Sequence, residues 1–271
     1  MIDKNEFKTS KYLAGEDSYK SQGIKSYHSW YATLKFFTFF PKMVIKGGNL
    51  AKKGLYNSRA WINASIDIFF ALENSGITFE IEGMKNIQKV NGPVVFISNH
   101  MSTLETVILP SIIHPVKYVT FIVKQELLKI PYFGLLLKAR KPIVVGRTNP
   151  REDLINVLQT GNEYLKNGKS VIIFPQKTRS NYLELSSFNT LGVKLAKKAD
   201  VPIIPVALVT DAWANGKFVK EVGKIDPEKK VYFSFGEPIK VTTAGAIEHQ
   251  MVLDFIKAKF IQWGKRDLIK D

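Results

Sequence analysis

The 271-residue sequence contains no cysteine. This absence excludes disulfides, thiolate nucleophiles and every metal site that is built on cysteine. Long hydrophobic runs are also missing. The sequence has no uncharged apolar stretch of ~18 residues, so a conventional spanning helix is not expected. The N-terminus is polar, carries both signs of charge and lacks the apolar core of a secretory signal peptide. Any contact with a membrane is therefore predicted to be a surface contact.

Positive charge is abundant, with 39 Lys and Arg against 24 Asp and Glu, a net charge of +15. Such a surplus favours an anionic partner, either nucleic acid or lipid headgroups and phosphates. The charge is spread along the chain and no nucleic-acid motif occurs, so nucleic acid is not the expected partner. A non-catalytic, basic membrane- or nucleic-acid-binding protein stays open as an alternative.

Three regions are predicted from composition: a weakly structured polar arm (1–28), a helical, membrane-associating region (29–75) and an α/β domain (76–271). The helical region opens with a helix over 29–45 that is dense in aromatics and carries a lysine stripe. Pro41 is expected to kink or divide this helix.

A basic loop rich in Gly and Asn follows, and then a second helix over 59–74. Two interpretations of this region stay open. The first helix lies in the lipid interface with its lysines reaching upward, or the pair packs on the protein's own core. The aromatic residues beside lysines favour the membrane.

From residue 77 onward, apolar strand patterns alternate with helical ones, which is typical of a mainly parallel sheet flanked by helices. The predicted strands lie near 77–84, 93–99, 114–123, 142–147, 170–176, 201–208 and 231–239. The predicted helices lie near 103–113, 126–139 (short and broken), 151–167, 186–199 and 245–263.

The sharpest chemical feature follows the strand at 93–99. His100 comes at its carboxyl end, where open α/β sheets place ligands, and Glu105 follows in the first turn of a helix. The carboxylate can then hold the imidazole, fix its tautomer and stabilise the imidazolium during general-base catalysis. Ser102 and Glu105 also form a Ser-x-x-Glu capping box. A purely structural role, with a capping Glu105 and an ordinary turn histidine, therefore stays open.

Cationic residues follow two further strands. Arg147 comes after one, and Lys177 and Arg179 come after another. Guanidinium groups can hold a phosphate bidentately, and a lysine adds a point charge. Each of these cations taken alone fits a solvated surface charge, but together they are expected to meet on the same edge as His100.

These segments resemble the 1-acyl-sn-glycerol-3-phosphate (lysophosphatidic acid) acyltransferase family, of the glycerophospholipid acyltransferase superfamily. Its Asn-His-x4-Asp block is similar to Asn99, His100 and Glu105, and its strand-end Arg to Arg147. Its Phe-Pro-Glu-Gly-Thr-Arg-Ser and Val-Pro-Ile-Val-Pro-Val blocks are similar to 174–180 and 201–206.

The resemblance implies an enzyme of the glycerolipid acyltransferase fold that transfers a fatty acyl group from acyl-CoA or acyl carrier protein to lysophosphatidic acid, giving phosphatidic acid. It implies a peripheral position on the cytoplasmic face of the cell membrane and no metal or other cofactor. The implied roles are catalytic for His100 and Glu105, phosphate-binding for Arg147, Lys177, Thr178 and Arg179, and supporting for Asn99, Ser102 and Gln176.

The sequence departs from the family at three positions. Glu105 replaces Asp, Gln176 replaces Glu, and Lys177 replaces Gly, where the family's residue serves backbone conformation or close ligand approach. These changes keep other acceptors open, namely glycerol-3-phosphate, another lysophospholipid or an aminolipid, as well as a catalytically weak basic membrane-binding paralogue.

Overall fold

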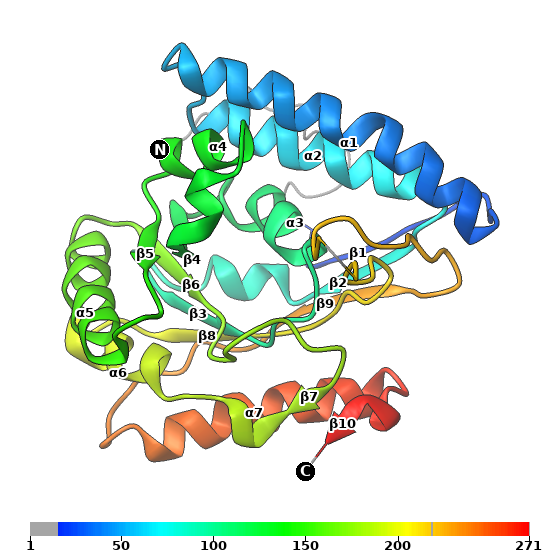
Figure 1. Cartoon of the computed structure of the whole chain (residues 1–271). Helices are drawn as coiled ribbons and strands as arrows, with labels where there is room; N and C mark the ends of the chain where they lie inside the picture. Colours follow the sequence, from blue (N-terminus) through cyan, green and yellow to red (C-terminus); the bar gives the residue numbers. More distant parts are fainter. Residues whose placement is uncertain (1–15, 218, 271) are drawn as a thin grey trace.

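The computed structural model of the protein describes residues 16–217 and 219–270. Within them, eight strands form one sheet in the order β1-β2-β9-β8-β3-β6-β4-β5 (Figure 1). They are β1 (Ser18–Lys20), β2 (Phe79–Glu82), β3 (Val95–Ser98), β4 (Val119–Lys124), β5 (Ile143–Val145), β6 (Ser170–Ile173), β8 (Ile203–Val209) and β9 (Val231–Phe235). A separate parallel pair joins β7 (Leu183–Glu184) to β10 (Ile269–Lys270).

The centre of the sheet is parallel. Strand β3 pairs with β8 on one side and β6 on the other, in a register that sets Val95 beside Ile203 and Val171. Every residue of β3, β6 and β8 is buried, as expected for strands covered on both faces. The prediction of a mainly parallel sheet is confirmed, and the carboxyl ends of β8, β3 and β6 meet at one edge.

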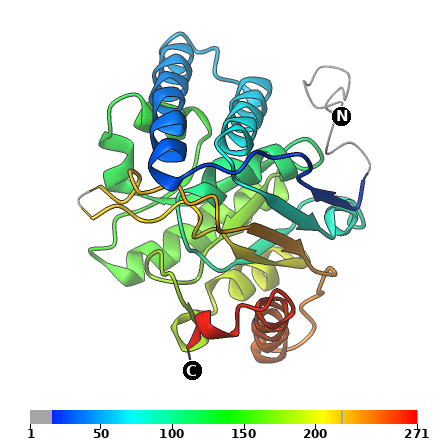
Figure 2. The same ribbon diagram turned by 90° about the vertical axis from the view of Figure 1, so that its right-hand side faces the viewer.

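Helices cover both faces of the sheet (Figures 1 and 2). On one face α3 (Leu104–Ile113) lies beneath the hairpin of α1 (Ser29–Lys52) and α2 (Ser58–Asn74), with α4 (Phe133–Ala139) beside α1. The other helices are α5 (Pro150–Lys166), α6 (Leu191–Ala199) and α7 (Ala246–Gln262). Short 3₁₀ turns are η2 (Met84–Ile87), η3 (Gln125–Lys129), η4 (Leu185–Ser187) and η5 (Arg266–Leu268).

Helix α1 corrects one prediction, because it runs without a break through Pro41 and through Gly47 and Gly48 of the expected loop, and ends at Lys52. Gly47 and Gly48 are buried where α4 crosses α1. A Cβ on Gly48 would lie 2.7 Å from Cβ of Tyr132, and one on Gly47 would lie 2.7 Å from Cδ2 of Leu136. The two glycines thus provide a contact surface for α4, and this packing offsets the helix-breaking tendency of Pro and Gly.

The first helix has one face packed on the protein's own core and one face that is exposed. Phe36 and Phe40 are buried and pack edge-on against Trp213, so this face belongs to the core. On the other face Trp30 is 69% exposed and Leu34 is 58% exposed. No helix in the described part of the chain is long and apolar enough to cross a bilayer.

The polar arm differs from its prediction at residues 18–20, which form a strand, whereas residues 21–28 are in neither helix nor strand and residues 1–15 lie outside the described residues. Strand β1 pairs antiparallel with β2. The Tyr19 hydroxyl donates to Oε1 of Glu73 over 2.7 Å, and its ring packs against Phe69 at 5.5 Å. Backbone pairing and one aromatic contact therefore order a segment that has little apolar surface of its own.

Candidate active site

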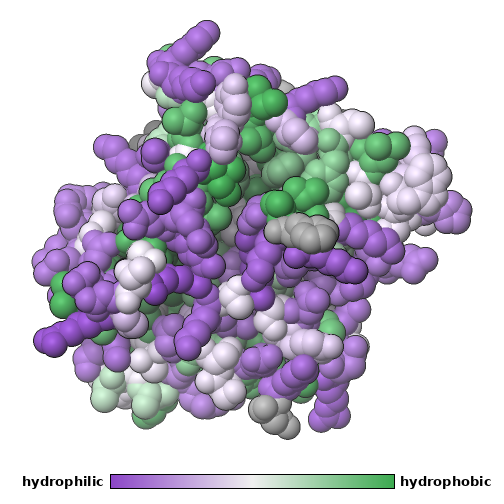
Figure 3. Space-filling view, viewed as in Figure 1, coloured by the Kyte–Doolittle hydropathy of each residue, from purple (hydrophilic) through white to green (hydrophobic). Residues whose placement is uncertain are grey.

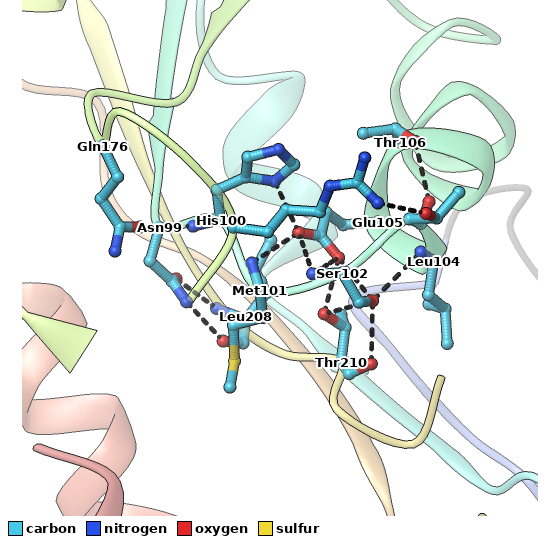
Figure 4. Close-up of polar contacts among 12 residues, drawn as sticks. Asn99, His100, Met101, Ser102, Leu104, Glu105, Thr106, Gln176, Leu208 and Thr210 are labelled. Atoms are coloured by element: carbon cyan, nitrogen blue, oxygen red, sulfur yellow. Dashed lines mark hydrogen bonds and ion pairs between the residues drawn. The ribbon is translucent and has the colours of Figure 1, made fainter. Parts of the chain in front are cut away.

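His100 lies two residues after the end of β3, and Glu105 lies in the first turn of α3 (Figure 4). Nδ1 of His100 lies 2.8 Å from Oε1 of Glu105. Because a carboxylate only accepts, this contact places the proton of the neutral imidazole on Nδ1 and leaves the lone pair on Nε2. The His100 side chain is 18% exposed and lines a cavity, so Nε2 can accept a proton from a bound molecule.

The Glu105 carboxylate is fully buried and accepts hydrogen bonds from every side. Its donors besides His100 are the N–H groups of Met101 and Ser102 and the hydroxyls of Ser102 and Thr210. Burial alone would raise the pKa of Glu105, but the bonds from His100, Thr210 and the Ser102 backbone outweigh it and hold this pKa below its ordinary value. The carboxylate therefore stays charged beside the imidazole.

The predicted capping box forms in part. Glu105 reaches back to the Ser102 N–H at 2.9 Å, as a capping box requires. The Ser102 hydroxyl, however, accepts from Leu104 N–H and donates to Glu105 or Thr210 rather than capping residue 105. One carboxylate thus both caps α3 and holds the imidazole, so the two readings of Glu105 are compatible.

Asn99 and Gln176 hold the backbone on either side of the imidazole. The Asn99 side-chain amide donates to the Leu208 carbonyl at 2.8 Å and accepts from the Leu208 N–H at 3.0 Å. These two bonds extend the β3–β8 pairing by one residue. Oε1 of Gln176 accepts from the His100 N–H at 2.6 Å. The Phe174 ring stacks on the imidazole at 4.2 Å. These contacts leave the His100 ring one orientation, toward the cavity.

The cavity has a volume of about 1210 Å³ and lies between the sheet edge and the α1–α2 hairpin. Its walls are mostly apolar and come from α1, α2, α3, β4 and α4; they include Phe40, Val44, Val107, Phe121 and Leu136. In the space-filling view, apolar side chains gather around a hollow in this part of the surface (Figure 3). Near His100 the lining becomes polar and cationic. The cavity can hold a molecule with a long apolar part and an anionic part.

The sequence-predicted cations lie on the lining of this cavity. Arg147 has a positive φ of 63°, and its backbone N–H donates to Asp153 at 2.7 Å. Its guanidinium donates to the carbonyl of Lys177, which links the ends of β5 and β6. Thr178 also lines the cavity, and its hydroxyl accepts from Nζ of Lys220 at 3.0 Å. The strand-end rule therefore placed these residues on one rim.

Arg179 reaches the same rim but is already engaged. Its guanidinium donates to the Thr103 hydroxyl at 2.6 Å and forms an ion pair with Glu221. The sequence reasoning did not identify Glu221, Lys220 or Thr103 as parts of the site. Nothing in the local sequence around 220 marks it, because this segment lies far along the connection between β8 and β9 rather than directly at a strand end. Thr210 was also missed, although it comes directly after β8 at the same sheet edge.

His114, by contrast, is not a second proton acceptor. Its ring is fully buried, and Nδ1 accepts from the backbone N–H of Val119 at 3.1 Å. Burial, together with the nearby charges of Arg140 and Lys169, lowers the pKa of His114 to about 3. In the described residues, no group of three or more His, Asp or Glu side chains could hold a metal ion.

The site thus combines a candidate proton acceptor, held by a buried carboxylate, with an apolar cavity and a cationic rim. Residues 78–209 match the family model described as Acyltransferase. The predicted resemblance is confirmed, because this central part of the chain matches an acyltransferase domain.

Curated relatives of this chain have more specific names than the family model. The chain is 38% identical over 152 residues to the 1-acyl-sn-glycerol-3-phosphate acyltransferase of Pseudomonas aeruginosa, covering 56% of this chain and 57% of that protein. It is 33% identical over 119 residues to the protein of the same name from Escherichia coli, covering 44% and 48%. The chain thus spans about half the length of the curated relatives it matches.

A solved structure supports the fold. The 1-acyl-sn-glycerophosphate acyltransferase PlsC from Thermotoga maritima superposes with a TM-score of 0.69 at 22% identity, covering 88% of this chain and 97% of that one. The superposition therefore includes elements outside the matched domain.

Proposed function

We propose that this chain transfers a fatty acyl group from an acyl thioester to the free hydroxyl of 1-acyl-sn-glycerol-3-phosphate, giving phosphatidic acid. The observation that carries this proposal is the His100–Glu105 contact of 2.8 Å at the polar end of a largely apolar cavity. The printed names of the relatives support the choice of acceptor.

In the proposed reaction, Nε2 of His100 removes the proton from the acceptor hydroxyl, and the oxygen attacks the thioester carbonyl carbon. The carbon–sulfur bond then breaks, and the thiolate takes the proton back from the imidazolium. The Glu105 carboxylate stabilises the imidazolium while it exists. Backbone N–H groups or a basic side chain near His100 would stabilise the oxyanion. The chemistry needs no metal, since the base and the charged groups come from side chains.

The substrate would lie with its phosphate on the cationic rim and its acyl part along the apolar walls. Arg147, Lys177, Thr178 and Arg179 are the proposed phosphate ligands, and all four line the cavity. Asn99, Ser102 and Gln176 would support His100 through the contacts described above. Acyl-CoA and acyl carrier protein are both suitable donors for this chemistry.

We further propose that the enzyme works at a phospholipid surface, as a peripheral protein on the cytoplasmic face of the cell membrane. The exposed surface of α1 supports this, because it carries the apolar Trp30, Leu34 and Ile45 as well as the exposed Lys42 and Lys46. Apolar side chains of this kind enter the interface while lysines meet anionic headgroups.

Purified protein, lysophosphatidate and each donor type in turn would test the proposal. We expect phosphatidic acid to form with at least one donor, and His100→Ala to abolish turnover while folding and vesicle binding persist. Normal turnover by His100→Ala would refute the proposed base. A panel that includes glycerol-3-phosphate, other lysophospholipids and an aminolipid is the second arm, because activity confined to a non-phosphorylated acceptor would refute the proposed substrate.

A further inference from the structure

Arg179 is the most enclosed of the proposed phosphate ligands, and its partner is an acidic residue. The Arg179 and Glu221 side chains are only 14% and 23% exposed, and both line the cavity that His100 lines. One nitrogen of the guanidinium donates to Thr103, and another donates to Oε1 of Glu221. A phosphate that binds Arg179 bidentately needs the edge that Glu221 occupies.

Glu221 comes from the connection between β8 and β9, which the structure describes over 211–217 and 219–226 and whose two ends are held by contacts with the rest of the fold. Trp213 of this segment is fully buried against Phe36 and Phe40 of α1. The N–H and carbonyl of Ile225 bond to side chains at the start of α1. The side-chain amide of Asn215 donates to the carbonyl of Met101, the residue that follows His100. The position of this segment over the rim is therefore a built part of the fold.

Two glycines allow the segment to turn back above the rim. A Cβ on Gly216 would lie 2.2 Å from the carbonyl oxygen of Val219, and one on Gly223 would lie 1.7 Å from that of Ala214. The turn carries Lys220 and Glu221 side by side, with Lys220 on Thr178 and Glu221 on Arg179. Two adjacent residues of opposite charge, Lys220 and Glu221, thus contact two residues of the proposed phosphate site.

We propose that Glu221 is an acceptor-specificity residue whose carboxylate occupies Arg179 in the free enzyme and is displaced by the phosphate of the acceptor. The inference rests on the proposed function, because it takes Arg179 as a phosphate ligand. A phosphate and a carboxylate cannot share the guanidinium edge without like-charge repulsion. Glu221 therefore raises the KM for the acceptor, and Lys220 lowers it.

This arrangement favours a phosphate monoester over other anions. A dianionic monoester replaces one negative charge at Arg179 with two, whereas the monoanionic diester of an ordinary phospholipid headgroup replaces one with one. The attraction that Arg179 loses when Glu221 leaves is thus more than replaced by a monoester, but it is only matched by a diester. At a surface crowded with diester headgroups, Glu221 keeps Arg179 available for the acceptor.

The test compares wild type with Glu221→Gln, Lys220→Gln and the matched control Glu237→Gln. Glu237 is a carboxylate paired with Lys89 outside the cavity, so its replacement makes the same change in net charge. Steady-state rates are measured against lysophosphatidate in mixed micelles, together with inhibition by the soluble headgroup glycerol 3-phosphate. Glycerol 3-phosphate reports on the site without the lipid surface.

We expect Glu221→Gln to lower the KM for lysophosphatidate and the inhibition constant of glycerol 3-phosphate by about threefold to tenfold, with kcat within about twofold of wild type. Lys220→Gln should raise both constants, and Glu237→Gln should change neither. An unchanged or higher KM in Glu221→Gln would overturn the inference, since Glu221 would then be inert or would merely position Arg179. A wild type that does not use lysophosphatidate would instead refute the proposed function itself.

Discussion

Replacing Glu105 with Gln isolates the charge that the proposed mechanism requires. In the native site, one oxygen accepts from His100 Nδ1 and the Met101 N–H, and the other meets the hydroxyls of Ser102 and Thr210. The Gln carbonyl can take the first set, and its NH₂ group can donate to the second, because hydroxyl hydrogens rotate to suit. The tautomer of His100 is therefore retained, and only the negative charge is lost.

The expected loss follows from the distance between the charges. An imidazolium and a carboxylate whose charges lie about 4 Å apart attract each other by about 4 kcal/mol at the effective dielectric constant of a partly buried pair. This attraction is present only after His100 has taken the proton, so its loss raises the barrier to acyl transfer. We expect kcat of Glu105→Gln to fall roughly 10³-fold, measured as phosphatidic acid formed from lysophosphatidate at saturating donor.

Glu248→Gln is the matched control, because Glu248 is also a buried carboxylate that accepts from a threonine hydroxyl and backbone N–H groups. It lies at the start of α7 and does not line the cavity. We expect this variant to retain wild-type kcat, and both variants to show a cooperative thermal transition by calorimetry. A Glu105→Gln enzyme with wild-type kcat, or one whose activity falls only with its folded fraction, would show that Glu105 is a cap and nothing more.

Three further predictions concern other parts of the molecule. Gly48→Ala should lower the free energy of unfolding in urea by about 1–3 kcal/mol, because its Cβ would overlap Tyr132; wild-type stability would contradict the α1–α4 contact. Leu34→Glu should weaken sedimentation with phosphatidylglycerol vesicles by about tenfold without changing Tm, and unchanged binding would place the membrane face elsewhere. The Thr243 hydroxyl and nearby backbone N–H groups lower the pKa of Glu248 to about 2. The difference in the free energy of unfolding between wild type and Glu248→Gln should therefore be present at roughly pH 6 and vanish near pH 2. A difference independent of pH would exclude ionisation as its cause.

The fold class and the centre of the site were predictable from the sequence, because both depend on local rules. A short apolar run such as 94–97 is typical of a strand buried on both faces, and parallel strands bring their carboxyl ends to one edge. His100, Arg147 and Lys177 follow such strand ends, so their gathering around one cavity required no knowledge of long-range packing. Glu105, five residues after His100, is brought to it by the turn into α3.

Other features depend on contacts between residues far apart in the chain, for which the local sequence contains no signal. Helix α1 includes Gly47 and Gly48, which pack against residues at α4, about 85 residues later in the chain. Residues 18–20 of the polar arm form a strand through their pairing with the edge of β2.

The partner of Arg179 is likewise set by tertiary structure. Glu221 reaches it from a segment held in place by Trp213 against α1, and a charge in a loop pairs with whatever the fold brings near it. Local sequence thus determined which residues gather at the candidate site, whereas long-range packing decided which partners each of them contacts there.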